Sequence, residues 1–313
     1  MGGGRGVATC ESVPDAVFAK IFALLPSAQI ASSCALVCRA WRDYTQDATL
    51  WSELCEGSGL RAIDAMRCLG GWRGLFGSVY GLNLVASPHF ERVHFYEADR
   101  LKHQSLRPWE PKHRLIIDRI CSDNESDEET HSYGYWATEG GSVFQRGGGD
   151  GVLRECPALD CSPCPVAERE PVLATSWDWG KVQQYIGLQT FSNKFLDCSP
   201  PMMFSIWYAG KKGAPSVFKA QVVLRDELKN IIFVWESGEL ETTENVWKQE
   251  KHLIQNYPPG MRSIVVKAAG MSIQHKSGFH GAKFTAVKLQ FVPVNEVPLH
   301  IEQPILGKKF SQF

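Results

Sequence analysis

The sequence lacks long apolar runs, an excess of either charge, and an apolar stretch at its N-terminus. A helix that crosses a bilayer needs about 20 consecutive apolar residues, so no membrane span is predicted. Lysine and arginine (33) nearly balance aspartate and glutamate (34), which leaves no electrostatic footprint for nucleic acid. The first six residues, Met-Gly-Gly-Gly-Arg-Gly, lack the apolar centre of a secretory signal. We therefore expect a protein of the cytoplasm, or of the cytoplasm and nucleus.

The ten cysteines, without a secretory signal, predict reduced thiols rather than a disulfide framework. Cys156, Cys161 and Cys164 have the only metal-like spacing, and no second pair of ligands follows them at a suitable distance. Prolines interrupt the same stretch three times, which favours a rigid loop over a zinc site. We expect neither a metal nor a cofactor.

Residues 10 to about 80 carry apolar side chains at helical spacing. The repeating positions of the first helix are Val13, Val17, Ile21 and Leu24, widened by Phe18, Phe22 and Leu25. Ser12 is a candidate N-cap and Pro26 ends this helix. A second helix is predicted over 28–34, and a third that carries Leu36, Val37, Ala40, Trp41 and Tyr44 on one side. Leu50 and Trp51 close the set.

About the first 45 residues of this stretch hold more large apolar side chains than so small a unit can bury. A domain of about 60 residues buries only about 60% of the surface of its unfolded chain. Some of Phe18, Phe22, Leu25 and Trp51 should therefore stay exposed unless another protein covers them. The alternative is that they pack on the second domain of this chain.

The remaining pattern predicts an antiparallel β-sandwich, so the fold class is α+β with a helical domain first. The acidic run 122–130 should be a solvated loop because it has almost no apolar residues to bury. The clearest predicted strands are 202–208, 217–224, 231–235, 263–267 and 282–292, with Ile206, Val222, Phe233 and Val265 in the core. In the last strand the apolar alternation changes parity between Ala286 and Val287, which predicts a β-bulge.

Residues 12–55 resemble an F-box. The matching motifs are Val13-Pro14, Ile21-Phe22, Leu25-Pro26, Leu36-Val37-Cys38-Arg39-Ala40-Trp41 and Leu50-Trp51. The resemblance implies that the apolar face binds a Skp-type adaptor, which links to a cullin scaffold and a ubiquitin-charged partner. The adaptor-binding residues that it implies are Pro14, Val17, Ile21, Phe22, Leu25, Pro26, Trp41, Leu50 and Trp51.

Residues 83–293 resemble the F-box-associated domain of the sugar-recognising F-box-only proteins. The matching segments are Asn83-Leu84 with Pro88, 147–151, 176–179, 207–210, 257–260 and 279–283. The resemblance implies a jelly-roll-like, galactose-binding-like sandwich. It divides the chain into an F-box module (10–56), a helical linker (57–82), the sandwich (83–293) and a C-terminal tail (294–313).

In that family, loops at one end of the sandwich hold the inner core of a high-mannose N-glycan. By resemblance, Trp177 stands at the aromatic position and Lys276 at the lysine of a Tyr-Trp-Lys run, whereas Gln274 and His275 replace the aromatic pair. Two missing rings remove much of the expected stacking on sugar. The predicted target-binding residues are therefore Trp177, Gln274, His275 and Lys276. The target is either a high-mannose or misfolded glycoprotein or a plain protein surface.

These features predict a substrate-recognition subunit of an SCF-type cullin E3 ubiquitin ligase that is not itself an enzyme. Two alternatives remain: a ubiquitin-independent lectin or chaperone-like binder, and a carbohydrate-active hydrolase, whose chemistry sandwiches also carry. No nucleophile or orienting acid stands at a recognisable spacing from His275 and His280, so no catalytic residue is predicted. Trp177 and Trp179 alternate in a β-like stretch, so only one of them should face the core.

Overall fold

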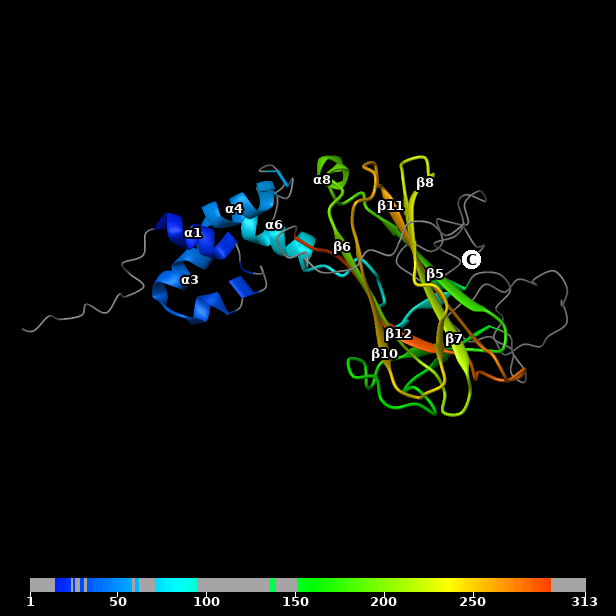
Figure 1. Ribbon diagram of the computed structural model, residues 1–313. Coiled ribbons are helices and arrows are strands. Elements are labelled where there is room, and N and C mark those ends of the chain that lie inside the picture. The colour runs from blue at the N-terminus through cyan, green and yellow to red at the C-terminus, as the bar shows by residue number, and fades with distance from the viewer. Residues whose placement is uncertain are drawn as a thin grey trace, which may run out of the picture. The chain divides into compact units, whose positions relative to one another are not determined.

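The computed structural model describes residues 15–23, 25, 29–30, 33–57, 60–61, 71–94, 136–138 and 151–293. The chain divides into two compact units, of which the first comprises the residues up to Tyr80 with the segment from Val292 onward, and the second spans Gly81–Phe291. Figure 1 shows the first unit in blue and cyan and the sandwich of the second mainly in green to orange. Some predictions fall outside the described residues: Pro14, Pro26, the acidic run 122–130 and the tail 294–313. No helix within the described ranges is long and apolar enough to cross a membrane.

The first unit consists of short helices. They are α1 (Asp15–Ala23), the 3-10 helix η2 (Cys34–Leu36), α3 (Arg39–Gln46), α4 (Ala48–Gly57) and α6 (Gly71–Tyr80). The predicted third helix begins only at Arg39, because Cys34–Leu36 forms a separate 3-10 turn. Between α3 and α4 the carboxylate of Asp47 accepts a hydrogen bond from the Thr49 N–H (2.8 Å), which satisfies one free donor at the start of α4.

Aromatic side chains fill the space between α1 and α3. The ring of Phe22 lies 5.2 Å from that of Trp41 and is stacked on Tyr44 at 5.8 Å. Phe18 lies 5.0 Å from Tyr44. Phe18 and Phe22 are 4% and 0% exposed. Of the four residues of which some were expected to stay exposed, these two are covered by rings of α3 within the same unit.

Trp51 of α4, another of the four residues of which some were expected to stay exposed, is also buried. Its ring packs against Phe76 of α6 at 5.4 Å, and its indole N–H donates to the Thr45 carbonyl (2.8 Å). Leu50 beside it is buried as well. The α6 helix lies beyond the F-box-like segment in sequence. It covers Trp51, and the estimate of how much apolar surface the F-box-like segment can bury did not include this helix.

The second unit is a β-sandwich of two sheets (Figure 1). Its strands are β1 (Val93–His94), β2 (Trp136–Thr138), β3 (Val152–Glu155), β4 (Val172–Thr175), β5 (Gly180–Gly187), β6 (Met202–Ala209), β7 (Ser216–Arg225), β8 (Ile231–Glu236), β9 (Leu240–Thr242), β10 (Lys248–Ile254), β11 (Ser263–Ser272) and β12 (Lys283–Phe291), with a short helix α8 (Asn193–Asp197). One sheet has the order β1-β2-β5-β11-β7-β8, with β9 also on β7, and the other β10-β6-β12-β4-β3. Among these strands each pairing is antiparallel except β1 with β2. The predicted sandwich is confirmed.

Alternate side chains of the two sheets meet in the core. Phe218 of β7 stacks on Tyr208 of β6 at 4.8 Å and lies 5.5 Å from Phe284 of β12. Phe204 of β6 lies 5.2 Å from Trp235 of β8. These contacts fix which face of each strand points inward, and so which loops emerge beside one another at the ends.

Three of the four predicted core residues are buried: Ile206, Val222 and Val265 are each 0% exposed. Val265 nevertheless lies on the opposite face of its sheet from Val222, since it pairs with residues of the other parity. Phe233 is only half-buried, which corrects the prediction. It belongs to β8, the last strand in the order of its sheet, where one flank of a side chain has no strand beside it.

The predicted bulge in β12 is confirmed. Ala286 has a φ of 53°, and the register with β6 shifts around it while Val287 stays buried. Asn83 fills the gap, because its amide nitrogen donates to the Val287 carbonyl (3.1 Å) and its oxygen accepts from the Leu289 N–H (3.0 Å). A residue from the start of the second unit thus completes the hydrogen bonding of its last strand.

Candidate functional site

The helical unit exposes aliphatic side chains beside its aromatic core. On α1, Val17 and Ile21 stand about one turn apart and are 43% and 37% exposed. Leu36 at the end of η2 and Val37 after it are 79% and 57% exposed. We call these four residues the aliphatic set. Burying one such side chain contributes roughly 1.5–3 kcal/mol, so the set is suited to a protein partner.

The predicted adaptor-binding residues divide by burial. Val17 and Ile21 are exposed, Leu25 and Trp41 are half-buried, and Phe22, Leu50 and Trp51 lie in the core. Phe22, Leu50 and Trp51 pack beneath the exposed side chains and are not accessible to an adaptor in this conformation. Leu36 and Val37 were assigned to the apolar side of a longer helix, and the 3-10 turn turns them outward instead.

The sandwich has its candidate site where three connections meet. They are 176–179 between β4 and β5, 210–215 between β6 and β7, and 273–282 between β11 and β12. The Ser272 N–H donates to the Ser176 carbonyl (2.8 Å), and the Ile273 N–H donates to the Pro215 carbonyl (2.9 Å). These backbone bonds hold the three connections side by side.

Gly281 anchors the end of the third connection. Its N–H donates to the Thr175 carbonyl (2.7 Å), and a Cβ placed on it would lie 2.3 Å from the Thr175 hydroxyl oxygen. No larger residue fits there without a shift of β4 or of the connection. The close approach sets where the residues before Gly281 emerge from the sandwich.

Neither tryptophan of the first connection faces the core, which corrects the prediction that one would. Trp177 is 39% exposed. Trp179 is half-buried, and the ammonium group of Lys219 lies 4.2 Å from the centre of its ring. Lys219 is itself 7% exposed, and burial lowers the pKa of its ammonium group. Trp177 is therefore the ring available to a ligand, and Trp179 covers the outer face of its sheet.

The third connection presents polar groups. Gln274 and Lys276 are exposed and His275 is half-buried. The ring of His275 lies 4.8 Å from that of His280, a residue that the sequence pattern did not place in the site. Burial, followed by nearby positive charges, lowers the pKa of His280. In the sequence the two histidines flank Gly278, but with no nucleophile or orienting acid at a recognisable spacing the pair was given no predicted role.

The cysteine-rich loop that follows β3 is held by a buried ion pair and by hydrogen bonds. Buried Lys283 donates to the Glu155 carboxylate and to the Leu159 carbonyl, and Glu155 also accepts from the Leu159 N–H (2.8 Å). Cys164 is buried and Cys161 is partly buried in the same apolar cluster, and burial raises the pKa of both thiols. Within the described ranges no group of three metal-ligating side chains occurs. These two thiols behave as small apolar side chains.

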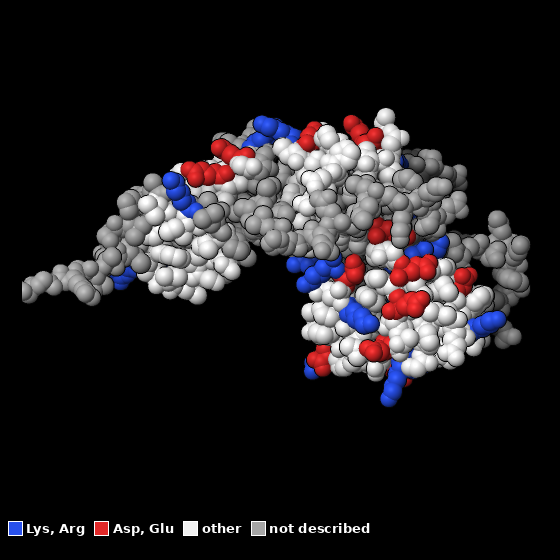
Figure 2. Space-filling view, in the orientation of Figure 1, with Lys and Arg blue, Asp and Glu red and all other residues white. Residues whose placement is uncertain are grey.

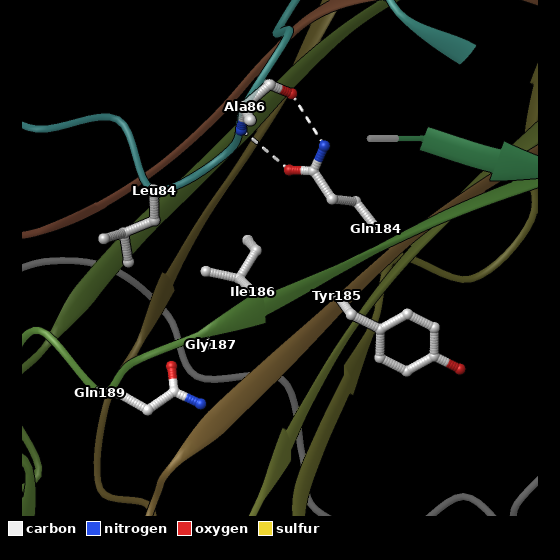
Figure 3. A pocket seen from close by; sticks show the side chains of 7 residues that line it. All are labelled: Leu84, Ala86, Gln184, Tyr185, Ile186, Gly187 and Gln189. Atoms are coloured by element: carbon white, nitrogen blue, oxygen red, sulfur yellow. Dashed lines mark hydrogen bonds between the residues drawn. The ribbon is translucent and has the colours of Figure 1, made fainter. Parts of the chain in front are cut away.

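A hollow of about 240 Å³ lies along β5 and is lined by Leu84, Ala86, Gln184, Tyr185, Ile186, Gly187 and Gln189 (Figure 3). The amide of Gln184 is turned toward Ala86, donating to its carbonyl (2.8 Å) and accepting from its N–H (2.9 Å). Because this buried amide is already paired within the chain, we assign the hollow to the packing of the segment before β1. Figure 2 shows acidic and basic side chains interspersed over the described surface of the second unit on the face in view.

Comparisons with known proteins agree with both parts of this description. An F-box-like region matches residues 10–57, and an F-box associated region matches residues 123–290. F-box only protein 2 of Bos taurus is 24% identical and covers 88% of this chain and 81% of its own. F-box only protein 6 of Rattus norvegicus is 22% identical, covering 88% and 84%. Among solved structures, a xylan-binding domain from Paenibacillus barcinonensis aligns at a TM-score of 0.32 and 12% identity over 52% of this chain and 89% of its own, a similarity too low to carry an argument.

Proposed function

This chain belongs to the F-box associated family, and on that premise we propose that it is the substrate-recognition subunit of an SCF-type cullin ubiquitin ligase. An F-box-like region precedes the F-box associated region in the chain. In this proposal the helical unit binds a Skp-type adaptor, which joins it to a cullin scaffold in the cytoplasm or nucleus. The sandwich binds the target.

The aliphatic set is the observation that carries the proposal. Leu36 and Val37, within the F-box-like region, are exposed by more than half of their surface although the unit has few residues with which to form a core. Large aliphatic groups left in water favour a partner that removes them from it. A Skp-type adaptor is the partner that an F-box-like region implies.

The target surface in this proposal is the loop end of the sandwich. Trp177 offers a ring for stacking on a sugar face or an apolar side chain. Gln274 and Lys276 are exposed and offer hydrogen-bond donors for hydroxyl or carbonyl groups. The target is a protein, and a high-mannose N-glycan on it is one group that this end would meet.

We propose no catalytic role for the chain itself. The similar proteins from Bos taurus and Rattus norvegicus are both named as F-box proteins and neither as an enzyme. The ubiquitin-charged partner of the assembled ligase would carry out the chemistry. Recognition, in this proposal, is the contribution of the present chain.

Adaptor capture tests the first half of the proposal. We expect Ile21→Glu and Val37→Glu in the full chain each to weaken capture of a purified Skp-type adaptor roughly thirtyfold, or about 2 kcal/mol, because each buries a charge in an apolar interface. Leu228→Glu is the matched control, since Leu228 is 81% exposed on the β7–β8 turn of the second unit. Unchanged capture by both helical variants would contradict the proposal.

Target capture tests the second half. The full chain with Trp177→Ala should keep the adaptor and lose targets, as measured by quantitative mass spectrometry of captured proteins with and without enzymatic removal of N-glycans. Loss of targets after glycan removal alone assigns recognition to the sugar. An unchanged set of targets in the Trp177→Ala chain places target recognition elsewhere.

A further inference from the structure

Two imidazole rings lie side by side in the β11–β12 connection. The ring centroids of His275 and His280 are 4.8 Å apart, and their planes are tilted by 44°. Gly278 between them has a φ of 72°, and a Cβ on it would lie 3.1 Å from His280 Nε2, so the turn backbone packs against that ring. In the described part of the chain, neither ring forms a hydrogen bond with the protein. Both half-buried rings therefore keep their nitrogens for an external ligand.

The groups around His280 are mostly basic. Lys211, from the β6–β7 connection, and Lys283, from β12, both act on it as positive charges. Asp160, from the cysteine-rich loop, is the acid that acts on it, and this carboxylate pairs with Lys211 at 2.8 Å. Lys283 pairs with buried Glu155. The local acids are thus already engaged, and an anionic ligand would meet little repulsion from them.

We propose that His275, His280 and Lys276 form a subsite for a carboxylate on an acidic side chain of the target polypeptide. This inference rests on the proposed function, because it specifies what the loop end of the sandwich selects. Imidazole N–H groups and an exposed ammonium group give short, charge-assisted hydrogen bonds to carboxylates. A neutral sugar would gain less here, since Gln274 and His275 stand where two stacking rings were expected.

The surroundings of the subsite favour a polypeptide as the ligand. Trp177 and Ile273 are 39% and 50% exposed, and they follow two residues whose backbones are hydrogen-bonded, Ser176 and Ser272. An exposed indole ring and an exposed branched aliphatic side chain suit an apolar side chain of a protein. The preferred target segment therefore has an acidic residue close to an apolar one.

Binding at this subsite should take up a proton. Burial, together with Lys211, His275 and Lys283, lowers the pKa of His280, while Asp160 acts in the opposite direction. A bound carboxylate favours the protonated ring and raises that pKa. Affinity for the acidic ligand should therefore rise as pH falls through the range where histidine titrates. The gain is about tenfold for each unit by which the bound ligand raises the pKa of His280.

The test is an NMR titration of the full chain with matched peptides. The probes are acetyl-Leu-Glu-Glu-Leu-amide, the same peptide with Gln for Glu, and chitobiose, with ring signals assigned through His275→Gln and His280→Gln. We expect the Glu peptide to shift both rings, to raise the pKa of His280, and to bind about tenfold more tightly near pH 5.5 than near pH 8. His252 of β10, stacked on Trp235 at 4.6 Å, is the internal reference, and its signal should not move when peptide is added at constant pH.

Two outcomes would overturn the subsite. One is equal binding of the Glu and Gln peptides, or none by either up to the limit of solubility. The other is a Glu peptide whose affinity and pH dependence survive both His280→Gln and Lys276→Ala. Capture of the Skp-type adaptor by the same preparations keeps the two questions apart: capture without peptide binding rejects only the subsite, and failure of the unaltered chain to capture adaptor rejects the proposed function.

Discussion

The helical unit and the sandwich hold their candidate binding surfaces in different ways. In the helical unit a few rings around Phe22 support exposed aliphatic side chains such as Leu36 and Val37. In the sandwich the binding loops are tied by backbone hydrogen bonds and by a buried ion pair between Lys283 and Glu155. The first arrangement suits a partner that is bound by apolar burial alone. The second positions individual polar groups.

This difference has consequences for both stability and binding. A small helical core has few contacts to spare, so the loss of one ring should remove the whole surface. The larger sandwich can lose a side chain and stay folded. Apolar burial changes little with pH or salt, whereas the sandwich loops carry a titratable group, His280, that responds to both.

The largest expected contrast comes from the same substitution in the two cores. Phe22→Ala and Phe284→Ala each remove a fully buried ring, which costs about 3–5 kcal/mol. We expect Phe22→Ala to unfold the helical unit and abolish adaptor capture. Phe284→Ala should leave both units folded at 25 °C with a lower melting temperature. Circular dichroism and adaptor capture measure the two effects, and equal tolerance of both substitutions would remove the contrast.

Breaking the buried ion pair should come next in size. Lys283→Met leaves the Glu155 carboxylate buried without its cation, which costs about 3–5 kcal/mol in denaturant unfolding of the sandwich. The double variant Glu155→Leu with Lys283→Met should recover most of that loss. Asp160→Asn is the matched control, because Asp160 is exposed and its pair with half-buried Lys211 should contribute little. If Lys283→Met is as stable as the unaltered chain, the ion pair does not stabilise the cysteine-rich loop.

Much of the sandwich could be predicted from the sequence because apolar and polar residues alternate along a half-buried strand. The parity change at Ala286 and Val287 located a bulge to the residue. The alternation does not show whether a strand lies at the edge of its sheet, where a side chain has fewer neighbours. Phe233 was therefore placed in the core although it is half-buried. The pairing of Lys283 with Glu155 joins residues 128 positions apart, and no local pattern reports it.

The candidate sites were harder to predict than the fold. Trp51 was one of four residues of which some were expected at the surface, and it is buried because Phe76, a residue outside the F-box-like segment, packs against it. Leu36 and Val37 were read as one face of a helix, and a 3-10 turn changed their direction. His280 joins His275 only through the conformation of a glycine turn, which sequence spacing does not determine.

A pair of glycine substitutions should sharpen the comparison at smaller energies. Gly77→Ala, inside α6 with open space around it, should stabilise the helical unit by about 0.5–1 kcal/mol. Gly281→Ala should destabilise the sandwich by about 1–3 kcal/mol and displace the loop end, because its Cβ meets Thr175. Melting curves give the signs, and target capture should fall for Gly281→Ala alone. The same sign for both would show that the close approach at Gly281 is not limiting.

The smallest expected effect is a pH dependence confined to one of the two units. The helices of the first unit all lie before residue 81, and that part of the sequence contains no histidine. In the sandwich, His252 is half-buried and stacked on Trp235 at 4.6 Å, and burial lowers the pKa of its ring. Burial raises the pKa of Glu250, on the same strand, which acts in the opposite direction at lower pH.

The sign follows from which state binds the proton. Below about pH 6.5 the unfolded chain protonates His252 more readily than the folded one, so the free energy of unfolding falls as pH falls from there toward the lower folded pKa. His252→Phe keeps a ring against Trp235 and should make that pH dependence shallower, while Glu250 contributes equally to both chains and cancels in the comparison. Denaturant unfolding of the two chains between about pH 8 and pH 5.5 measures the difference. Adaptor capture should stay level over the same range, because the aliphatic set carries no titratable group. Equal slopes for the two chains would show that His252 titrates alike in the folded and unfolded states.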